Sequence, residues 1–204
     1  MSRHSFEQQT SIEQLLQRPD IWQSARRRQQ QTGISTGFDA LDSCLHLGGW
    51  PCSSMAEILG RQQGIGELQL LLPTLARLTN TGRYCLLLSP PYTPYPAALA
   101  AAGVSVDRLL VIDCDNTRQQ LWSAEQTLRS GAAGCVIAWF GRQKLDTAQL
   151  RKLLLAAKHS DTLLLLQRHH SMAQQASPAG LRLLLGCTQT GQLQLDVLKQ
   201  PGGW

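Results

Sequence analysis

Residues 55–68 read MAEILGRQQGIGEL, and this stretch decides how the chain is expected to fold. The apolar run 55–59 has the length and composition of a buried strand, and glycines 60, 64 and 66 interrupt regular structure directly after it. Beyond them, Leu68, Leu71, Leu72 and Leu75 recur at helical spacing on one face. The stretch therefore predicts a strand, a glycine turn and an amphipathic helix in succession.

The glycine turn has the position of a phosphate-binding loop but lacks its chemistry. Such a loop reads Gly-x-x-x-x-Gly-Lys-Ser/Thr, in which the lysine reaches the β/γ-phosphates and the hydroxyl holds Mg²⁺. Here Gly66 and Glu67 stand in the last two places. Glu67 puts a negative charge on the donors that an anion would need. We therefore expect no nucleotide turnover and no cofactor, although the glycines leave binding without turnover open.

Two further positions, at the end of the apolar run 135–140 and after the run 85–89, also lack the acidic group that nucleotide hydrolysis needs. Phosphoryl transfer relies on positioned charges. The arrangement resembles that of RecA-like ATPases, and this resemblance implies a carboxylate at the end of a central strand and a general-base glutamate after a neighbouring one. The apolar run 135–140 offers Trp139 at the first place, and Pro90 and Pro91 follow the run 85–89 at the second. Three vacant catalytic positions predict a protein that is not an enzyme.

Apolar strands and amphipathic helices alternate along the chain, which predicts an α/β fold with a mostly parallel sheet and helices on both faces. A helix is expected to begin after Asp146, with Gln149 as its capping-box partner. Residues 168–178 are polar and are expected to form a surface loop. The predicted strands and the antiparallel C-terminal hairpin are residues 55–59, 84–89, 109–114, 135–140, 162–167, 181–187 and 193–199.

Three regions are expected along the chain. Residues 1–32 form an N-terminal helical extension, residues 33–199 the core domain, and residues 200–204 a flexible tail that contains Pro201 and paired glycines. The extension carries a basic run of Arg26, Arg27 and Arg28. Such a run is typical of a solvated helix face, and the alternative is a phosphate or acidic-partner contact.

Composition excludes several classes of protein. The 204-residue chain has a net charge of +5, too mild to indicate a DNA-binding protein by itself. Its apolar runs fall short of the roughly 18 residues of a membrane span, so we expect a cytoplasmic protein without membrane contact. The six cysteines form no Cys-x-x-Cys pair, which favours free, buried thiols and no metal site.

Other polar groups are better explained by local structure than by chemistry. Asp113 and Asp115 follow a predicted strand, where open α/β sheets often bind ligands, but a turn or helix cap is favoured. His169 and His170 are adjacent and lack an acidic or thiol partner in sequence. Of the five tryptophans, Trp204 follows two glycines at the chain end, where an exposed indole is typical of a partner anchor.

Several short strings, taken in order, resemble the ImuA family, the RecA-like proteins associated with damage-induced mutagenesis. The resemblance covers roughly residues 32 to 203 and adds the expectation of a degenerate RecA-like core. It also extends in part to the SulA family of cell-division inhibitors, which is expected to lack the segment 36–51. The strings are TGFDALD (36–42), GGWP (48–51), GIGEL (64–68), LRSG (128–131), AW (138–139), SPA (177–179), LRL (181–183) and LK (198–199).

The resemblance implies an adaptor of SOS-induced translesion DNA synthesis that acts with ImuB, an inactive Y-family polymerase relative, and with an error-prone DnaE-type polymerase. Contact with RecA is implied as well, with residues 11–28 as the docking element and only indirect or weak DNA contact. Residues 198–204 are the expected contact for ImuB, including Leu198, Lys199, Gly202, Gly203 and Trp204. The alternative is a SulA-like division inhibitor that binds FtsZ.

Overall fold

A computed structural model describes residues 33–61, 64, 66–188 and 192–202. The expected docking element 11–28 therefore lies outside the described residues. The helices are α3 (Asp39–Cys44), α4 (Glu67–Asn80), α5 (Pro96–Ala101), α6 (Thr117–Ser130) and α7 (Thr147–Ser160), with short 3₁₀ turns η1 (Val106–Arg108) and η2 (His170–Gln174). The strands are β1 (Met55–Gly60), β2 (Tyr84–Leu88), β3 (Leu109–Ile112), β4 (Ala133–Gly141), β5 (Leu163–His169), β6 (Leu181–Cys187) and β7 (Leu193–Lys199).

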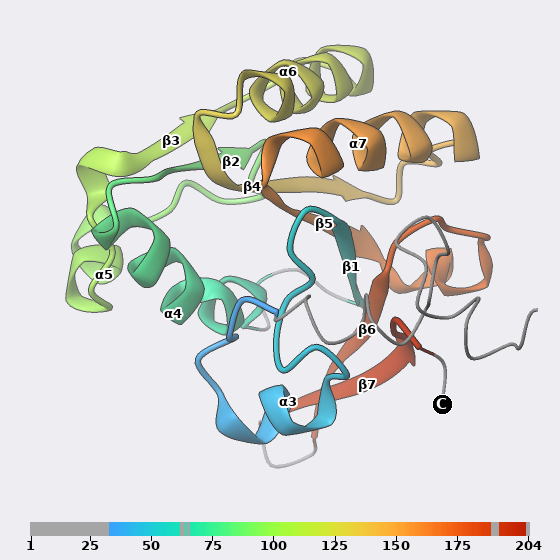
Figure 1. Cartoon of the computed structure of the whole chain (residues 1–204), viewed down its shortest axis with the longest axis horizontal. Helices are drawn as coiled ribbons and strands as arrows, with labels where there is room; N and C mark the ends of the chain where they lie inside the picture. The colour runs from blue at the N-terminus through green and yellow to red at the C-terminus, as the bar shows by residue number, and fades with distance from the viewer. Residues whose placement is uncertain (1–32, 62–63, 65, 189–191, 203–204) are drawn as a thin grey trace, which may run out of the picture. The chain divides into compact units, whose positions relative to one another are not determined.

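The strands form one sheet in the order β3-β2-β4-β5-β1-β6-β7. Neighbouring strands from β3 to β6 run parallel, and β7 returns antiparallel to β6 at the edge (Figure 1). The α/β fold with an antiparallel C-terminal hairpin is therefore confirmed. Because all parallel strands end at the same edge, the loops after β1, β2, β4 and β5 are brought near one another.

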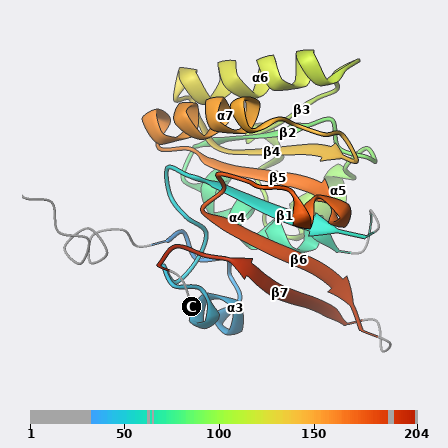
Figure 2. The same cartoon turned by 90° about the vertical axis from the view of Figure 1, so that its right-hand side faces the viewer.

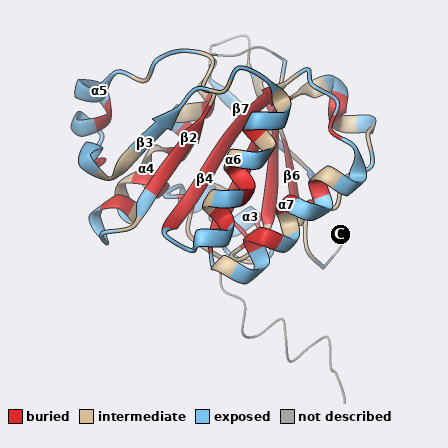
Figure 3. Cartoon of the chain, turned by 90° about the horizontal axis from the view of Figure 1, so that it is seen from above, coloured by how far each residue is buried: buried red, intermediate tan, exposed pale blue. Residues whose placement is uncertain are grey.

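Helices cover both faces of the sheet. Figure 2 shows α6 and α7 on one face and α4 on the other. Alternate residues of each strand point to opposite faces, so Leu86 and Leu88 pack with α6 and α7 while Cys85 and Leu87 pack with α4. The central strands are buried along most of their length (Figure 3), as two-sided coverage of a parallel sheet requires.

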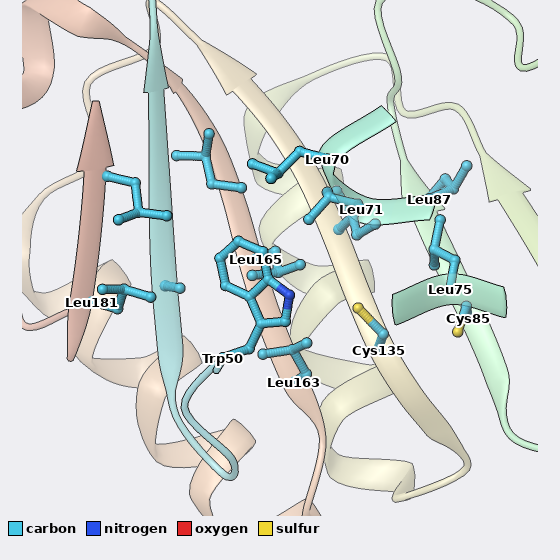
Figure 4. Close-up of a cluster of buried hydrophobic side chains, with 14 of the residues drawn as sticks. Trp50, Leu70, Leu71, Leu75, Cys85, Leu87, Cys135, Leu163, Leu165 and Leu181 are labelled. Atoms are coloured by element: carbon cyan, nitrogen blue, oxygen red, sulfur yellow. The ribbon is translucent and has the colours of Figure 1, made fainter. Parts of the chain in front are cut away.

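Trp50 lies at the centre of the core on the α4 face. Its side chain is fully buried among leucines of α4 and the sheet (Figure 4). The indole Nε1 donates a 3.0 Å hydrogen bond to the hydroxyl of Thr74 on α4. Because a buried indole needs an acceptor, this bond ties the segment before β1 to the first helix after it.

Helix α7 begins as the sequence predicts. Asp146 accepts a 2.7 Å bond from the backbone N–H of Gln149, and the Gln149 side chain accepts a 2.9 Å bond from the N–H of Asp146. This reciprocal capping box satisfies two donors at the start of the helix. The buried side chains of α7 are Leu150, Leu153, Ala156 and Ala157.

Candidate functional site

The turn between β1 and α4 holds a negative charge of its own. Glu67, the first residue of α4, is 7% exposed, and its Oε1 accepts a 2.6 Å hydrogen bond from the backbone N–H of Gly64. In a phosphate-binding loop, backbone N–H groups of this kind point at the ligand. Here a carboxylate from the chain occupies one of them, as the sequence predicted for Glu67.

The position of the absent lysine is itself unsuited to a side chain. Gly66 has φ of 108°, in the region that glycine adopts readily and other residues rarely do. A Cβ at this position would lie 3.2 Å from Leu193 Cδ1 of β7. The turn is therefore shaped around glycine at position 66, and a single substitution to lysine would strain it.

The structure brings together the three positions at which the sequence lacks the expected catalytic groups. Trp139 of β4 and Glu67 line a cavity of about 300 Å³ at the carboxyl ends of β1, β4 and β5. Both residues also line an adjoining cavity of about 310 Å³, whose wall includes Pro90 and Pro91 after β2. The sequence identified these positions separately, and the parallel topology makes them one site.

The first residue of the loop after β2, Ser89, is hydrogen-bonded to the end of β3. Ser89 has φ of 48°, and its hydroxyl accepts a 3.2 Å bond from the N–H of Cys114. Its own N–H donates to the carbonyl of Ile112 at 2.8 Å. These contacts join the ends of β2 and β3 and fix the direction in which Pro90 and Pro91 leave the sheet.

A buried ion cluster lies beside the cavity, and the sequence reasoning missed it. Glu57 in the middle of β1 is fully buried and contacts Arg168 Nη1 at 2.9 Å and Arg182 Nε at 2.7 Å. Ser177 donates a further 2.9 Å bond to Glu57 Oε1. A glutamate within one apolar strand and an arginine within another were the signals that could have indicated this pairing.

The cluster shows that the expectation of a surface loop at residues 168–178 was wrong for part of the segment. Arg168 is 3% exposed and lies next to the last residue of β5, and its Nη2 donates to Gln175 at 2.9 Å. Arg182 donates to the carbonyls of Met172 and Ala173, at 2.8 and 3.1 Å. The segment turns inward because the Glu57 carboxylate needs these donors once it is buried.

The proposed partner-binding residues are only partly described. Leu198 at the end of β7 is 36% exposed, and Lys199 Nζ donates to the carbonyl of Ser177 at 3.0 Å. Gly202 lies against the ring of His46. A Cβ added at Gly202 would be 3.0 Å from His46 Nε2. Arg26, Arg27, Arg28, Gly203 and Trp204 lie outside the described residues.

The remaining polar candidates have local roles. Asn116 caps α6 by accepting a 3.0 Å bond from the N–H of Gln119, and Asp113 and Asp115 before it are exposed. His169 Nδ1 accepts from the N–H of Ser171 at 3.2 Å and so caps η2. Among the described residues, no group of three or more His, Cys, Asp or Glu side chains could hold a metal ion.

The cysteines differ in burial, so the expectation of buried thiols holds for only some of them. Cys85 and Cys135 are buried in the sheet, whereas Cys44 and Cys187 are exposed. Burial raises the pKa of Cys85 to about 12, and it also raises the pKa of Cys135. In the part of the chain that the structure describes, no helix is long and apolar enough to cross a membrane.

The segment before β1 is an integral part of the fold. Asp42 of α3 accepts hydrogen bonds from the N–H and the hydroxyl of Thr36, at 2.8 and 2.7 Å. Burial raises the pKa of Asp42, but hydrogen bonds from Ser35 and Thr36 and the charge of Arg77 outweigh it and lower the pKa below 3.8. The segment that leads to Trp50 is thus folded back on itself before it enters the core.

The mostly parallel sheet, the glycine turn between β1 and α4 and the two helical layers define an α/β core of the RecA type. Consistent with this class, the RecA N-terminal domain family matches residues 8–139 of the chain. The chain belongs to this family.

Curated relatives agree with this assignment. The chain is similar to Protein RecA of Haemophilus ducreyi (32% identical), of Deinococcus radiodurans (36%) and of Mannheimia haemolytica (33%), each over 104 residues. The match covers 51% of this chain and 28% of the length of each relative. The chain therefore shares a part of RecA, and the activity of the whole relative is a separate question.

Proposed function

We propose that this protein is a non-catalytic member of the RecA-related group, an ImuA-like adaptor of SOS-induced translesion DNA synthesis. It would act with ImuB and an error-prone DnaE-type polymerase and would contact RecA. The observation that carries the proposal is the 2.6 Å hydrogen bond from Gly64 to Glu67, in a turn whose lysine position is a glycine with positive φ. This turn lacks the lysine that reaches the β/γ-phosphates in a phosphate-binding loop.

The rest of the site supports the absence of turnover. Phosphoryl transfer requires positive groups on the transferred phosphoryl and a carboxylate that positions Mg²⁺ or water. At the end of β4 the chain has the indole of Trp139, and after β2 it has two prolines. Each change by itself would reduce catalysis, and together they remove the loop charge, the metal ligand and the general base.

A RecA-shaped body without turnover is suited to binding other macromolecules. It can occupy a site shaped for a related protomer, and no hydrolysis step drives its release. The resemblance to the ImuA family supports ImuB, the DnaE-type polymerase and RecA as partners. We propose that residues 11–28 contact RecA and that the end of β7 with the following tail contacts ImuB.

Capture of purified partners tests the proposal. The full-length tagged protein should retain ImuB and RecA, and deletion of residues 1–32 should abolish RecA capture while ImuB capture remains. Leu198→Asp should weaken ImuB capture at least about tenfold, since a charge at an apolar contact is strongly unfavourable. Leu193→Asp on the same strand is a matched control because Leu193 is 39% and Leu198 36% exposed. Equal capture by both variants would refute the assignment of this contact.

Two measurements separate the proposal from its alternatives. Calorimetric titration with Mg-ATP, with and without DNA, together with a phosphate-release assay, should show neither uptake nor turnover. Tight uptake followed by phosphate release would refute the non-catalytic role. A SulA-like inhibitor would instead capture FtsZ and produce filamentous cells on overexpression. The segment 36–51, which that family is expected to lack, contributes the core residue Trp50 here.

A further inference from the structure

The cavity at the carboxyl ends of β1, β4 and β5 is lined by groups that donate hydrogen bonds. Its volume is about 300 Å³, enough for a small molecule or for one or two side chains. Trp139 and Gln167 are register partners on adjacent strands, and Arg168 follows Gln167 directly. The register thus places the side chains of Trp139 and Gln167 next to each other on the α4 face of the sheet, whereas Arg168, the next residue of β5, points to the other face.

Three buried nitrogens of residues that line the cavity lack acceptors. They are Trp139 Nε1, Gln167 Nε2 and Arg168 Nε, and none has a hydrogen-bond partner within the described part of the chain. The three residues are 7%, 6% and 3% exposed, respectively. The indole and guanidinium nitrogens can only donate. Because a buried donor without an acceptor is costly, the unpaired nitrogens of Trp139 and Gln167, adjacent on one face of the sheet beside the cavity, favour an acceptor at this site.

The charges around the cavity favour an anion of low charge. Arg61 and Arg142 line it together with Arg168, whose Nη1 and Nη2 are already bonded to Glu57 and Gln175. Glu67 also lines the cavity, and its carboxylate accepts the bond from Gly64. A polyphosphate would bring several negative charges to this carboxylate, whereas a single negative charge is favoured by the surrounding arginines.

We propose that this cavity binds a carboxylate group. An ionised carboxylate only accepts hydrogen bonds, and its two oxygens offer about four lone-pair sites, which suits the adjacent donors of Trp139 and Gln167. The terminal amide of Gln167 rotates over a broad range, so its N–H₂ group can turn toward a ligand that enters. A free small acid and the Asp or Glu side chain of a bound protein supply the same group. The inference goes beyond the adaptor role and does not depend on it.

Solution NMR of the full-length ¹⁵N-labelled protein tests this site directly. The indole N–H of Trp139 and the side-chain amide of Gln167 should shift and saturate on titration with sodium acetate. A blocked Gly-Glu-Gly peptide, which has no terminal carboxylate, tests the protein side chain as the source. Tighter binding of the peptide than of acetate supports a partner residue, and the reverse supports a free acid.

Two variants each remove one donor and leave an apolar side chain in its place. Trp139→Phe loses the indole N–H, and Gln167→Met loses the amide, and each should weaken binding at least about tenfold. Trp122→Phe is the matched control, since Trp122 is 63% exposed on α6 and lines no part of this cavity. Circular dichroism establishes that each variant is folded.

Three outcomes would overturn the proposal. The first is the lack of a saturable shift at Trp139 and Gln167 up to the solubility limit of both probes. The second is wild-type affinity in the Trp139→Phe and Gln167→Met variants. The third is tighter binding of Mg-ATP than of either carboxylate at the same two signals. Only the third outcome would also weaken the proposed non-catalytic role, because the first two leave the capture experiments unaffected.

Discussion

The carboxylate of Glu67 accepts a 2.6 Å hydrogen bond from the backbone N–H of Gly64, three residues before it in the turn between β1 and α4. The helix that follows a glycine turn has unpaired N–H groups and a positive dipole end, which together attract anions. In this protein the negatively charged group at the start of the helix is the Glu67 carboxylate, which belongs to the chain itself. The turn is therefore stabilised without a ligand, and a ligand phosphate would compete with a tethered carboxylate.

Glu67→Gln should loosen this turn without creating a nucleotide site. Removal of the charge weakens the bond to Gly64, and we expect a loss of about 1 kcal/mol in unfolding free energy. Hydrogen exchange of the Gly64 amide should become faster, and Mg-ATP should still not bind, because the lysine remains absent. Urea unfolding and NMR exchange measure these effects. Asp107→Asn, an exposed acid on η1, is the control and should change neither property. An unchanged Gly64 exchange rate in Glu67→Gln would contradict the assigned bond.

Glu57→Gln should be among the most destabilising conservative changes in the protein. Glu57 is the shared partner of Arg168 and Arg182, and loss of its charge leaves two guanidinium groups uncompensated in the interior. Breaking a buried ion pair in this way costs about 3–5 kcal/mol, measured here as the free energy of unfolding in urea.

Glu125→Gln provides a matched comparison for the Glu57 variant. Glu125 also contacts two cations, Arg129 at 2.8 Å and Lys152 at 2.6 Å, but both cations are 63% exposed. Because water screens these cations and solvates them when the pair is lost, we expect a cost of about 1 kcal/mol or less. Equal losses for the two variants would show that burial does not control the energy of the Glu57 cluster.

Asp42→Asn should change how stability depends on acid pH. The pKa of Asp42 is lower in the folded protein than its ordinary value of 3.8. The carboxylate therefore contributes stability that is complete above the unfolded pKa and is lost as the pH falls through the lower, folded pKa. The variant should lose about 1 kcal/mol at neutral pH and show a shallower decline below pH 3.8.

Asp39→Asn serves as the control for Asp42, because Asp39 lies on the same short helix and is exposed. Urea unfolding at a series of pH values compares the two variants with the wild type. If Asp39→Asn and Asp42→Asn have the same acid profile, the hydrogen bonds from Thr36 do not account for the lowered pKa.

Cysteine labelling should divide the six thiols by their burial. Cys44 and Cys187 are exposed and should react with iodoacetamide at pH 8 in the native protein. Cys85 should not react, since its pKa is raised to about 12 and the thiolate is the reactive form. Cys135 should be protected for the same reason. Mass spectrometry before and after denaturation measures the difference, and rapid native labelling of Cys85 would contradict the structure.

The strand and helix pattern was readable from residues that are neighbours in the chain. The seven predicted strands all form where the sequence places them, and for the buried strands β1, β2, β4 and β5 the reason is that each must be apolar over its own length. The cap formed by Asp146 and Gln149 is equally local. The replacement of the phosphate-loop lysine by Gly66 was visible for the same reason, since that motif depends on spacing within a single turn.

The buried polar groups required the tertiary structure. Arg168 was assigned to a surface loop because its sequence neighbours are polar, but its partner Glu57 is 111 residues away in the chain. The hydrogen bonds that justify burying such a charge depend on which strands become adjacent, and only the order β5-β1-β6 supplies them.

The sequence by itself determined the class of fold and the loss of the phosphate-loop lysine and hydroxyl, since both are encoded in short runs of consecutive residues. Only the tertiary structure decided that Glu67, Trp139 and Gln167 would line one cavity. The physical reason is the parallel sheet, which gathers the carboxyl ends of strands that are far apart in the chain at a single edge.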